Sequence, residues 1–338
     1  MLFLATLCYS CQKEDITIGL HADDTFYFES GGISMRVLVR GNTASNTFLV
    51  LVHGGPGSSS FGYDTPKMAE IVASECAVVF YDQRNAGASQ GNKNVANDNL
   101  DQYADDLKGL IKLLKLRYGQ DLNIFLMSKS FGGMVGSAFM TKDNNQDLVK
   151  GWLFVNASHN YGLNDSLTHQ KLLDASREHL AAGIKIDSWK PIFDYCQNNL
   201  PGPFTAEQSL KLNKLGWKAQ EIIEGMEPYD YNVIHDNMIT EDIPLTSYYL
   251  GRTNAGARNF NASLTPIKFS AELHKVTVPV LVCFSKLDFV CPEGLGVDFM
   301  SHIGSSDKQM LIFEKSAHHF EEQDAYYNAF VNFIIRHQ

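Results

Sequence analysis

One serine stands at a turn between a predicted buried strand and a predicted helix, where its hydroxyl could act as a nucleophile. Residues 123–127 form an apolar run with the length of a buried strand, and apolar side chains at helical spacing follow Gly133. Small residues flank Ser130 at Ser128, Gly132 and Gly133, as a sharp strand-to-helix turn requires. The stretch therefore predicts a nucleophile at Ser130. By itself it is equally compatible with an ordinary Ser-Gly-rich loop.

Two further reactive residues follow other predicted buried strands. Asp288 comes shortly after residues 278–284, and His318 comes shortly after residues 310–313. Because the carboxyl ends of parallel strands lie at one edge of a sheet, we expect Ser130, Asp288 and His318 to meet there. His318 would take the serine proton, and Asp288 would hold the imidazole and stabilise its charged form. Taken singly, Asp288 could be a turn residue and His318 a surface histidine.

A glycine-rich loop follows another buried strand and could stabilise an oxyanion. The non-alternating apolar run 47–52 leads directly into residues 53–57, His-Gly-Gly-Pro-Gly. Attack on a carbonyl group creates a negative oxygen, and backbone N–H groups aimed at it lower the barrier. We expect one N–H from Phe131, directly after the nucleophile, and another from this loop.

The elements that must position these residues alternate between buried strands and helices. Strands are expected at 47–52, 77–81, 123–127, 151–155, 278–284 and 310–313, with an antiparallel hairpin over 25–40. Helices are expected over 100–118, with Leu107, Leu110 and Ile111 on its apolar stripe, after the elbow, from about 292, and over 321–336. The inner face of the last helix is expected to carry Tyr327, Phe330, Val331, Ile334 and Ile335. The pattern predicts an α/β fold with a mostly parallel sheet covered by helices on both faces. Residues 16–157 and 273–338 form this core, and residues 158–272, rich in aromatics and without comparable strands, form an inserted, mainly helical cap.

Composition limits the classes of partner. Of 338 residues, 44% are hydrophobic and 20% are charged, which is typical of a globular protein. The formal net charge is 28 − 38 = −10, and no long basic run is present, so we expect no nucleic-acid partner. The spacing of the six cysteines indicates neither a zinc site nor a disulfide framework. We expect no metal and no cofactor.

The first fifteen residues read as a leader. Residues 1–11 are apolar and end at Cys11, after which residues 12–15 are abruptly polar. This is typical of the end of a bacterial lipoprotein signal, although the run is short and no basic residue precedes it. We therefore expect a lipid anchor at Cys11 and a location at the cell envelope. The alternative is a buried N-terminal segment of a cytoplasmic protein.

These motifs together resemble those of the proline iminopeptidase group of serine aminopeptidases, within the α/β hydrolases. The matching features are the His-Gly-Gly-Pro-Gly loop, Asp82-Gln83-Arg84 with Gly87 and Ser89, and the residues Ser130, Asp288 and His318. The resemblance covers the catalytic core on both sides of the cap. It implies the α/β-hydrolase fold, a triad of Ser130, Asp288 and His318, and oxyanion donors at Phe131 and Gly55, with Gly54 as the alternative. It also implies that residues 82–84 are a buried brace beneath the glycine-rich loop.

The sequence departs from the family pattern at several points. Ser128 and Asn85 stand where glycine is usual, Ala317 replaces the glycine before the histidine, and Phe131 replaces a frequent Trp or Tyr. The cap also lacks the family's Trp-x-x-Trp-Glu stretch, of which residues 216–221 are a faint echo. The sequence therefore leaves open whether proline is the preferred residue.

Three functions follow from these observations. The first is a serine aminopeptidase that releases an N-terminal residue from short peptides through an acyl-enzyme. The second is an esterase or amidase for small acyl substrates, and the third is a catalytically silent binding protein on a hydrolase scaffold. An aminopeptidase needs an anion for the substrate amine, and the cap acids available are Glu221, Glu224, Glu227, Asp230, Glu241 and Asp242. Lys129, beside the nucleophile, would pair with a carboxylate or touch the substrate.

Overall fold

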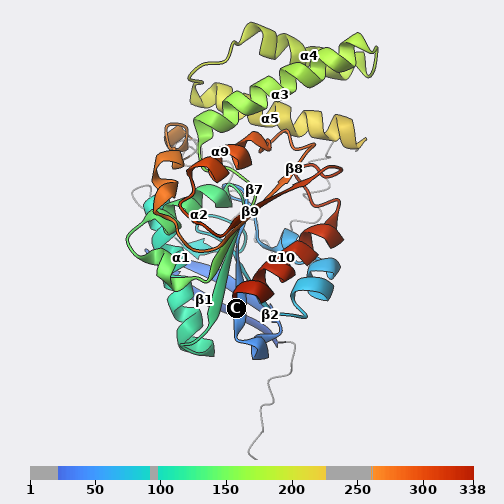
Figure 1. Ribbon diagram of the computed structural model, residues 1–338. Coiled ribbons are helices and arrows are strands. Elements are labelled where there is room, and N and C mark those ends of the chain that lie inside the picture. The colour runs from blue at the N-terminus through green and yellow to red at the C-terminus, as the bar shows by residue number, and fades with distance from the viewer. Residues whose placement is uncertain (1–21, 92–97, 226–259, 261) are drawn as a thin grey trace, which may run out of the picture.

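The computed structural model describes residues 22–91, 98–225, 260 and 262–338 (Figure 1). The predicted leader and lipid anchor at Cys11 lie outside the described residues, as does the part of the predicted cap over 226–259. No helix within the described ranges is both long enough and apolar enough to cross a membrane.

The core of the fold is a mostly parallel sheet, which has nine strands in the described part of the chain. Along the sheet the order is β1-β2-β4-β3-β6-β7-β8-β9, and the short β5 pairs with β2. All neighbours from β4 to β9 run parallel. The strands are β1 Ala22–Ser30, β2 Ile33–Gly41, β3 Thr47–Val52, β4 Ala77–Tyr81, β5 Gln90–Gly91, β6 Asn123–Ser130, β7 Gly151–Ala157, β8 Val280–Ser285 and β9 Lys308–Phe313.

The predicted hairpin forms the antiparallel edge of the sheet. β1 pairs with β2 from Ala22 opposite Gly41 to Ser30 opposite Ile33. The two residues between the strands, Gly31 and Gly32, have φ of 56° and 77°. Positive φ at both central positions is the requirement of the hairpin turn that matches strand twist, which explains the glycine pair.

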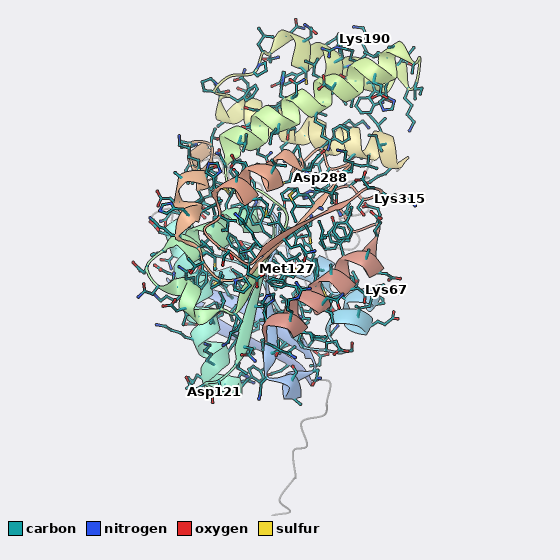
Figure 2. The ribbon with its side chains drawn as sticks, viewed as in Figure 1. Lys67, Asp121, Met127, Lys190, Asp288 and Lys315 are labelled. Atoms are coloured by element: carbon teal, nitrogen blue, oxygen red, sulfur yellow. The ribbon has the colours of Figure 1, made fainter. Side chains whose placement is uncertain are left out.

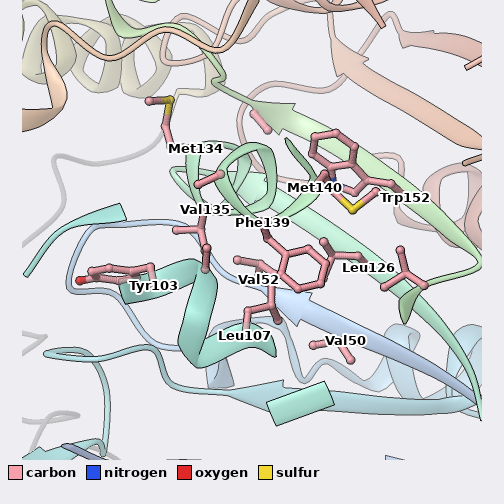
Figure 3. Close-up of a cluster of buried hydrophobic side chains, with 14 of the residues drawn as sticks. Val50, Val52, Tyr103, Leu107, Leu126, Met134, Val135, Phe139, Met140 and Trp152 are labelled. Carbon is pink, nitrogen blue, oxygen red and sulfur yellow. The ribbon is translucent and has the colours of Figure 1, made fainter. Parts of the chain in front are cut away.

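Helices cover both faces of the sheet and bury two separate cores. The core helices are α1 Leu100–Tyr118, α2 Gly132–Thr141, α9 Gly294–His302 and α10 Gln323–His337; short helical turns are η1 Thr43–Ser45, η2 Phe61–Tyr63, η3 Met68–Val72, η5 Asn145–Leu148 and η6 Ser270–Lys275. Side chains of α1, α2 and α9 pack on one face, shown in part in Figure 3. Side chains of α10 and η3 pack on the other. The α/β-hydrolase fold predicted from the sequence is therefore confirmed.

The inner face of the last helix differs from the prediction. The spacing placed Ile335 among the inward residues, but half of its surface (50%) is exposed. The buried residues of α10 are Tyr326, Tyr327, Phe330, Phe333 and Ile334. The ring of Tyr326 stacks on Phe313 of β9, with centroids 3.5 Å apart, and this contact sets the rotation of α10 about its own axis.

Between β7 and β8 the described insertion consists of three helices, α3 Tyr161–Ala181, α4 Ile186–Asn198 and α5 Ala206–Glu224. They lie together beyond the carboxyl ends of the strands, at the top of Figure 1. These helices have a core of their own, in which Trp189, Leu172 and Leu212 are fully buried. α5 also contacts the core domain, because a Cβ at Gly216 would lie 2.6 Å from the carbonyl oxygen of Phe289.

Candidate active site

The turn at Ser130 is strained in the way that an exposed nucleophile requires. Ser130 is the last residue of β6 and has φ of 56°, which is rare for a residue with a side chain. The following glycines allow a close approach. A Cβ at Gly132 would lie 2.0 Å from the carbonyl oxygen of Val52, and one at Gly133 would lie 2.5 Å from that of Ser158. The local structure is therefore the predicted nucleophile elbow.

Ser128 stands where the family usually has glycine, and a glycine on α2 leaves room for its side chain. Its hydroxyl is buried and accepts a hydrogen bond of 3.0 Å from the indole Nε1 of Trp152 on β7. Space for the hydroxyl is left by Gly136 on α2, where a Cβ would lie 2.1 Å from Ser128 Oγ. The serine therefore fills space that Gly136 leaves free, and it satisfies a buried indole N–H.

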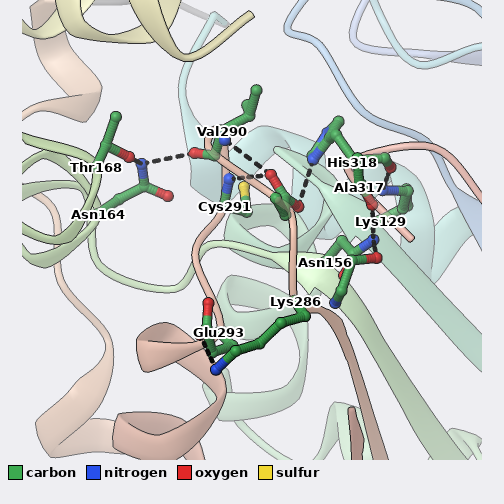
Figure 4. A network of polar contacts seen from close by, with 12 residues as sticks. Lys129, Asn156, Asn164, Thr168, Lys286, Val290, Cys291, Glu293, Ala317 and His318 are labelled. Atoms are coloured by element: carbon green, nitrogen blue, oxygen red, sulfur yellow. Dashed lines mark hydrogen bonds and ion pairs between the residues drawn. The ribbon is translucent and has the colours of Figure 1, made fainter. Parts of the chain in front are cut away.

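Asp288 and His318 form a buried hydrogen-bonded pair at the carboxyl edge of the sheet. The Nδ1–H group of His318 donates to Oδ2 of Asp288 over 2.7 Å. The other oxygen, Oδ1, accepts hydrogen bonds from the backbone N–H groups of Val290 at 2.7 Å and Cys291 at 2.8 Å (Figure 4). Figure 2 shows Asp288 between the sheet and the cap helices, at the opposite end of the molecule from Asp121, which precedes β6.

The electrostatics of this pair suit general-base chemistry. Burial alone raises the pKa of Asp288, but the charge and hydrogen bond of His318, with help from Lys129, hold it below its ordinary range. Burial lowers the pKa of His318, an effect that Asp288 opposes and Lys129 reinforces. A carboxylate therefore faces a neutral imidazole at neutral pH, which is the state that can accept a serine proton.

Ser130 lies against the glycine-rich loop and close to the loop that carries Asp288. A Cβ at Gly54 would lie 3.5 Å from Oγ of Ser130. The thiol of Cys291 interacts with Ser130, while its backbone N–H binds Asp288. Burial raises the pKa of the Cys291 thiol, so it stays protonated and does not compete as a nucleophile.

His53 and Gln83 hold the glycine-rich loop in place. The backbone N–H of Gln83 donates to Nε2 of His53 at 3.0 Å, and the Gln83 side-chain amide donates to the His53 carbonyl oxygen at 2.8 Å. Because Nε2 accepts, the proton of His53 is on Nδ1, which donates to the Gly54 carbonyl oxygen at 2.6 Å. Gly55 itself has φ of 141°, a backbone conformation that requires glycine.

The neighbours of Gln83 complete the buried brace that the resemblance implied. Asp82 accepts bonds from Ser60 N–H at 2.8 Å and Ala88 N–H at 2.8 Å. Arg84 donates two bonds, of 2.6 and 2.8 Å, to the carboxylate of Asp106. Asn85 has φ of 57°, which explains why glycine is usual there and why asparagine is tolerated.

Asn156 is a supporting residue that the sequence reasoning missed. It directly follows the predicted strand at 151–155 and has φ of 40°. Its amide nitrogen donates to Ser285 Oγ at 2.8 Å and to the carbonyl oxygen of Ala317 at 3.3 Å, while its oxygen accepts from Ser285 N–H at 2.8 Å. Asn156 therefore ties β7, β8 and the loop that carries His318 together. An asparagine at the carboxyl end of a buried strand was the only signal for it.

The cap contributes an aromatic ring beside His318 and a carboxyl group beside Glu321 of the same loop. Trp217 of α5 meets the His318 ring edge-on, with centroids 5.0 Å apart. Glu224, the last residue of α5, lies next to Glu321 of the histidine loop. Burial, followed by the negative charge and carboxyl contact of Glu321, raises the pKa of Glu224 to about 7. Of the other predicted cap acids, Glu221 pairs with Lys218 at 3.2 Å, and Glu227, Asp230, Glu241 and Asp242 lie outside the described residues.

Comparisons with known proteins agree with the fold and the motifs. A family model described as "Serine aminopeptidase, S33" matches residues 43–207. A proline iminopeptidase of Saccharolobus solfataricus is 26% identical over 301 residues, which cover 86% of this chain and 85% of that protein. The crystal structure of a proline iminopeptidase from Mycobacterium smegmatis matches with a TM-score of 0.64 at 19% identity, over 93% of this chain and 98% of that one. The crystal structure of an esterase from Rhodococcus matches with a TM-score of 0.59 at 18% identity, over 94% and 100%.

The chain therefore has the α/β-hydrolase fold. Among proteins with this fold, it is similar in sequence to the proline iminopeptidase-like serine aminopeptidases, as its motifs predicted.

Proposed function

We propose that this protein is a serine hydrolase that acts through an acyl-enzyme on Ser130. The observation that carries the proposal is the buried Asp288–His318 pair, with 2.7 Å between carboxylate and imidazole, at the sheet edge where the strained Ser130 ends β6. A histidine held in one tautomer by a buried carboxylate is suited to accept a serine proton. A purely binding role, the third function considered above, gives no reason to maintain this arrangement.

The mechanism follows from which atoms are already engaged. Because Nδ1 of His318 is bound to Asp288, Nε2 is the nitrogen that would take the proton from Ser130 Oγ during attack on the substrate carbonyl. The N–H groups of Phe131 and Gly55, or Gly54 in its place, would stabilise the tetrahedral oxyanion. His318 would then return the proton to the leaving group, and a water molecule activated by the same histidine would hydrolyse the acyl-enzyme.

Within this class we propose an aminopeptidase for short peptides. Glu224 and Glu321 bring two carboxyl groups together near Asp288 and His318, where a substrate ammonium would lie. One oxygen of Glu224 is buried without a close hydrogen-bond partner among the described residues, and the side chain of Gln220, one turn earlier on α5, interacts with the same carboxyl group. The neighbouring carboxyl group of Glu321 helps to keep a proton on Glu224. A cation bound between the two carboxyl groups would displace that proton. The sequence similarity to proline iminopeptidases supports the same assignment.

The second candidate is an esterase or amidase for small acyl substrates. It is favoured by the absence of the family's Trp-x-x-Trp-Glu stretch from the cap sequence. In that case the acid pair of Glu224 and Glu321 would have no amine to bind.

Hydrolysis of matched anilides separates the two candidates. We expect amino-acyl anilides with a free amine, including the prolyl compound, to be cleaved faster than their N-acetylated counterparts and than simple esters of the same acyl group. Equal or faster turnover of the N-acetylated compounds would reject the aminopeptidase and leave the esterase or amidase. Absence of any turnover, together with absence of labelling by a fluorophosphonate, would reject the serine hydrolase itself.

A further inference from the structure

Lys129, directly before the nucleophile, makes a contact that the sequence did not predict. Its side chain is 3% exposed, and its Nζ donates to the backbone carbonyl oxygen of His318 over 2.6 Å (Figure 4). The same ammonium lies 5.1 Å from the ring centroid of Phe320. Thus one side chain of the elbow strand binds the main chain of the catalytic histidine and packs against the residue two positions later.

The charged groups around this ammonium all belong to the site or lie beside it. Asp288, the thiol of Cys291 and Glu321 interact with Lys129. Burial lowers the pKa of Lys129 to about 8, and Asp288 opposes the decrease. The side chain is therefore mostly charged at neutral pH. Taking an ammonium out of water is costly, so this position would be apolar if packing were its only role.

Among the described residues, the other side chains that bind the histidine loop do not come from the elbow strand. They are Asp288, which binds His318, Asn156 on β7, which binds the carbonyl oxygen of Ala317, and Glu321 and Glu322 within the loop itself. The contact of Lys129 with His318 joins the strand that ends at Ser130 to the residue that must take the serine proton.

We propose that Lys129 is a positioning residue that holds the catalytic histidine over the nucleophile through its bond to the His318 main chain. The proposal rests on the serine-hydrolase function above. The charge has a second effect, because the Lys129 ammonium lowers the pKa of His318. The groups that face His318 are Asp288, Lys129, Glu321 and His319, with the ring of Trp217 edge-on from the cap. Of these, Lys129 is the one that is mostly positively charged at neutral pH.

The test is the rate of fluorophosphonate labelling as a function of pH, which needs no knowledge of the substrate. Lys129→Met keeps most of the side-chain volume but removes the donor and the charge. We expect it to lower the labelling rate at pH 7 by about tenfold to a hundredfold, as misplacement of a catalytic group does. We also expect the acid limb of the profile to move to higher pH, because His318 without the neighbouring cation binds its proton more tightly.

Two further variants separate positioning from packing. Lys129→Arg retains a cationic donor, so its acid limb should stay near that of the wild type even if its rate falls. Lys308→Met is the matched control, because Lys308 also donates to main-chain carbonyl oxygens, those of Met300 at 2.9 Å and Ile303 at 3.1 Å, away from the triad. It should change neither rate nor profile.

The outcomes distinguish the two proposals. Wild-type rate and profile in Lys129→Met, or a loss that only follows the unfolded fraction while the profile is unchanged, would overturn the role of Lys129. If Lys129→Met does not fold, the same profile is measured on Lys129→Arg and Lys129→Gln, and identical acid limbs in the two would overturn it. Absence of labelling in the wild type would overturn the serine-hydrolase function instead.

Discussion

Nδ1 of His318 lies 2.7 Å from Oδ2 of Asp288, and both side chains are buried. The other carboxylate oxygen is held by two backbone N–H groups, so Asp288 has little freedom to turn. This relationship fixes the tautomer of the imidazole and leaves Nε2 as the nitrogen that can take a proton. It is therefore the part of the site whose disruption should have the clearest chemical consequence.

Asp288→Asn should lower kcat by about 10³- to 10⁴-fold with little change in fold, because an amide favours the wrong imidazole tautomer. The matched control is Asp298→Asn. Asp298, on α9, also binds a histidine, His159, at 2.7 Å. We expect the control to lose stability and keep kcat per folded molecule. An Asp288→Asn variant that retains a tenth of the wild-type kcat would contradict this role.

Glu224→Gln should weaken the binding of substrates with a free amine. The raised pKa of Glu224, about 7, means that Glu224 holds a proton below that pH and is charged above it. KM for an amino-acyl anilide should therefore fall as pH rises through 7, until the substrate amine loses its own proton near pH 8. In Glu224→Gln this fall should disappear, and KM at pH 7.5 should rise about tenfold. N-acetylated substrates and Glu221→Gln serve as controls and should show no such change.

The same shift also affects stability, and its sign can be worked out. Between the ordinary pKa of 4.5 and about 7, the folded chain binds more protons at Glu224 than the unfolded chain does, so stability falls as pH rises through this window. Glu224→Gln should reduce that fall and raise the melting temperature at pH 8 relative to the wild type. A variant that is less stable than the wild type at pH 8 would show that the two carboxyl groups do not repel each other.

The sheet and the proximity of Asp288 to His318 could be predicted because their signals are local. Strands 47–52 and 77–81 match β3 and β4, since a strand buried on both faces is a continuous apolar run. Parallel strands end at one edge, so the residues that follow them could be placed together before any contact was known. The stripe of α1 was also correct, with Leu107, Leu110 and Ile111 fully buried.

The supporting residues could not be predicted, because their partners are distant in sequence. Lys129 binds a carbonyl oxygen 189 positions away, and Asn156 binds residues 129 and 161 positions away. No periodic pattern in the sequence predicts such contacts.

The error at Ile335 has a different source. A helix packed on a twisted sheet can rotate by one residue so that an aromatic ring stacks on the sheet, and helical spacing alone does not decide which of the two neighbouring faces is buried.

Gly132→Ala should destabilise the fold by about 2–3 kcal/mol, because the new Cβ would lie 2.0 Å from the Val52 carbonyl oxygen and the backbone must shift. The control is Gly109→Ala in α1, where the nearest atom would be 3.8 Å away. Alanine in place of a helical glycine that has free space around it should stabilise the folded protein by about 0.5–1 kcal/mol. Urea unfolding measures both. Equal effects of the two substitutions would contradict the tight packing of the elbow.

Ser128 and Gly136 should be energetically coupled. Ser128→Ala leaves the buried indole N–H of Trp152 unpaired and should cost about 1–3 kcal/mol. Gly136→Ala introduces a Cβ 2.1 Å from the Ser128 hydroxyl and should cost at least as much. In the double variant this clash is relieved, so its cost should be smaller than the sum by about 1 kcal/mol. Additive costs in urea unfolding would show that the two residues do not share this space.

Identification of the nucleophile tests the account most directly. The protein is treated with a fluorophosphonate, digested, and mapped by mass spectrometry, in parallel with a folded Ser130→Ala variant. We predict one phosphonyl group on the peptide that contains Ser130, and none anywhere in the variant. An adduct on another residue, or labelling that persists in Ser130→Ala, would contradict the assignment of Ser130 as the catalytic serine.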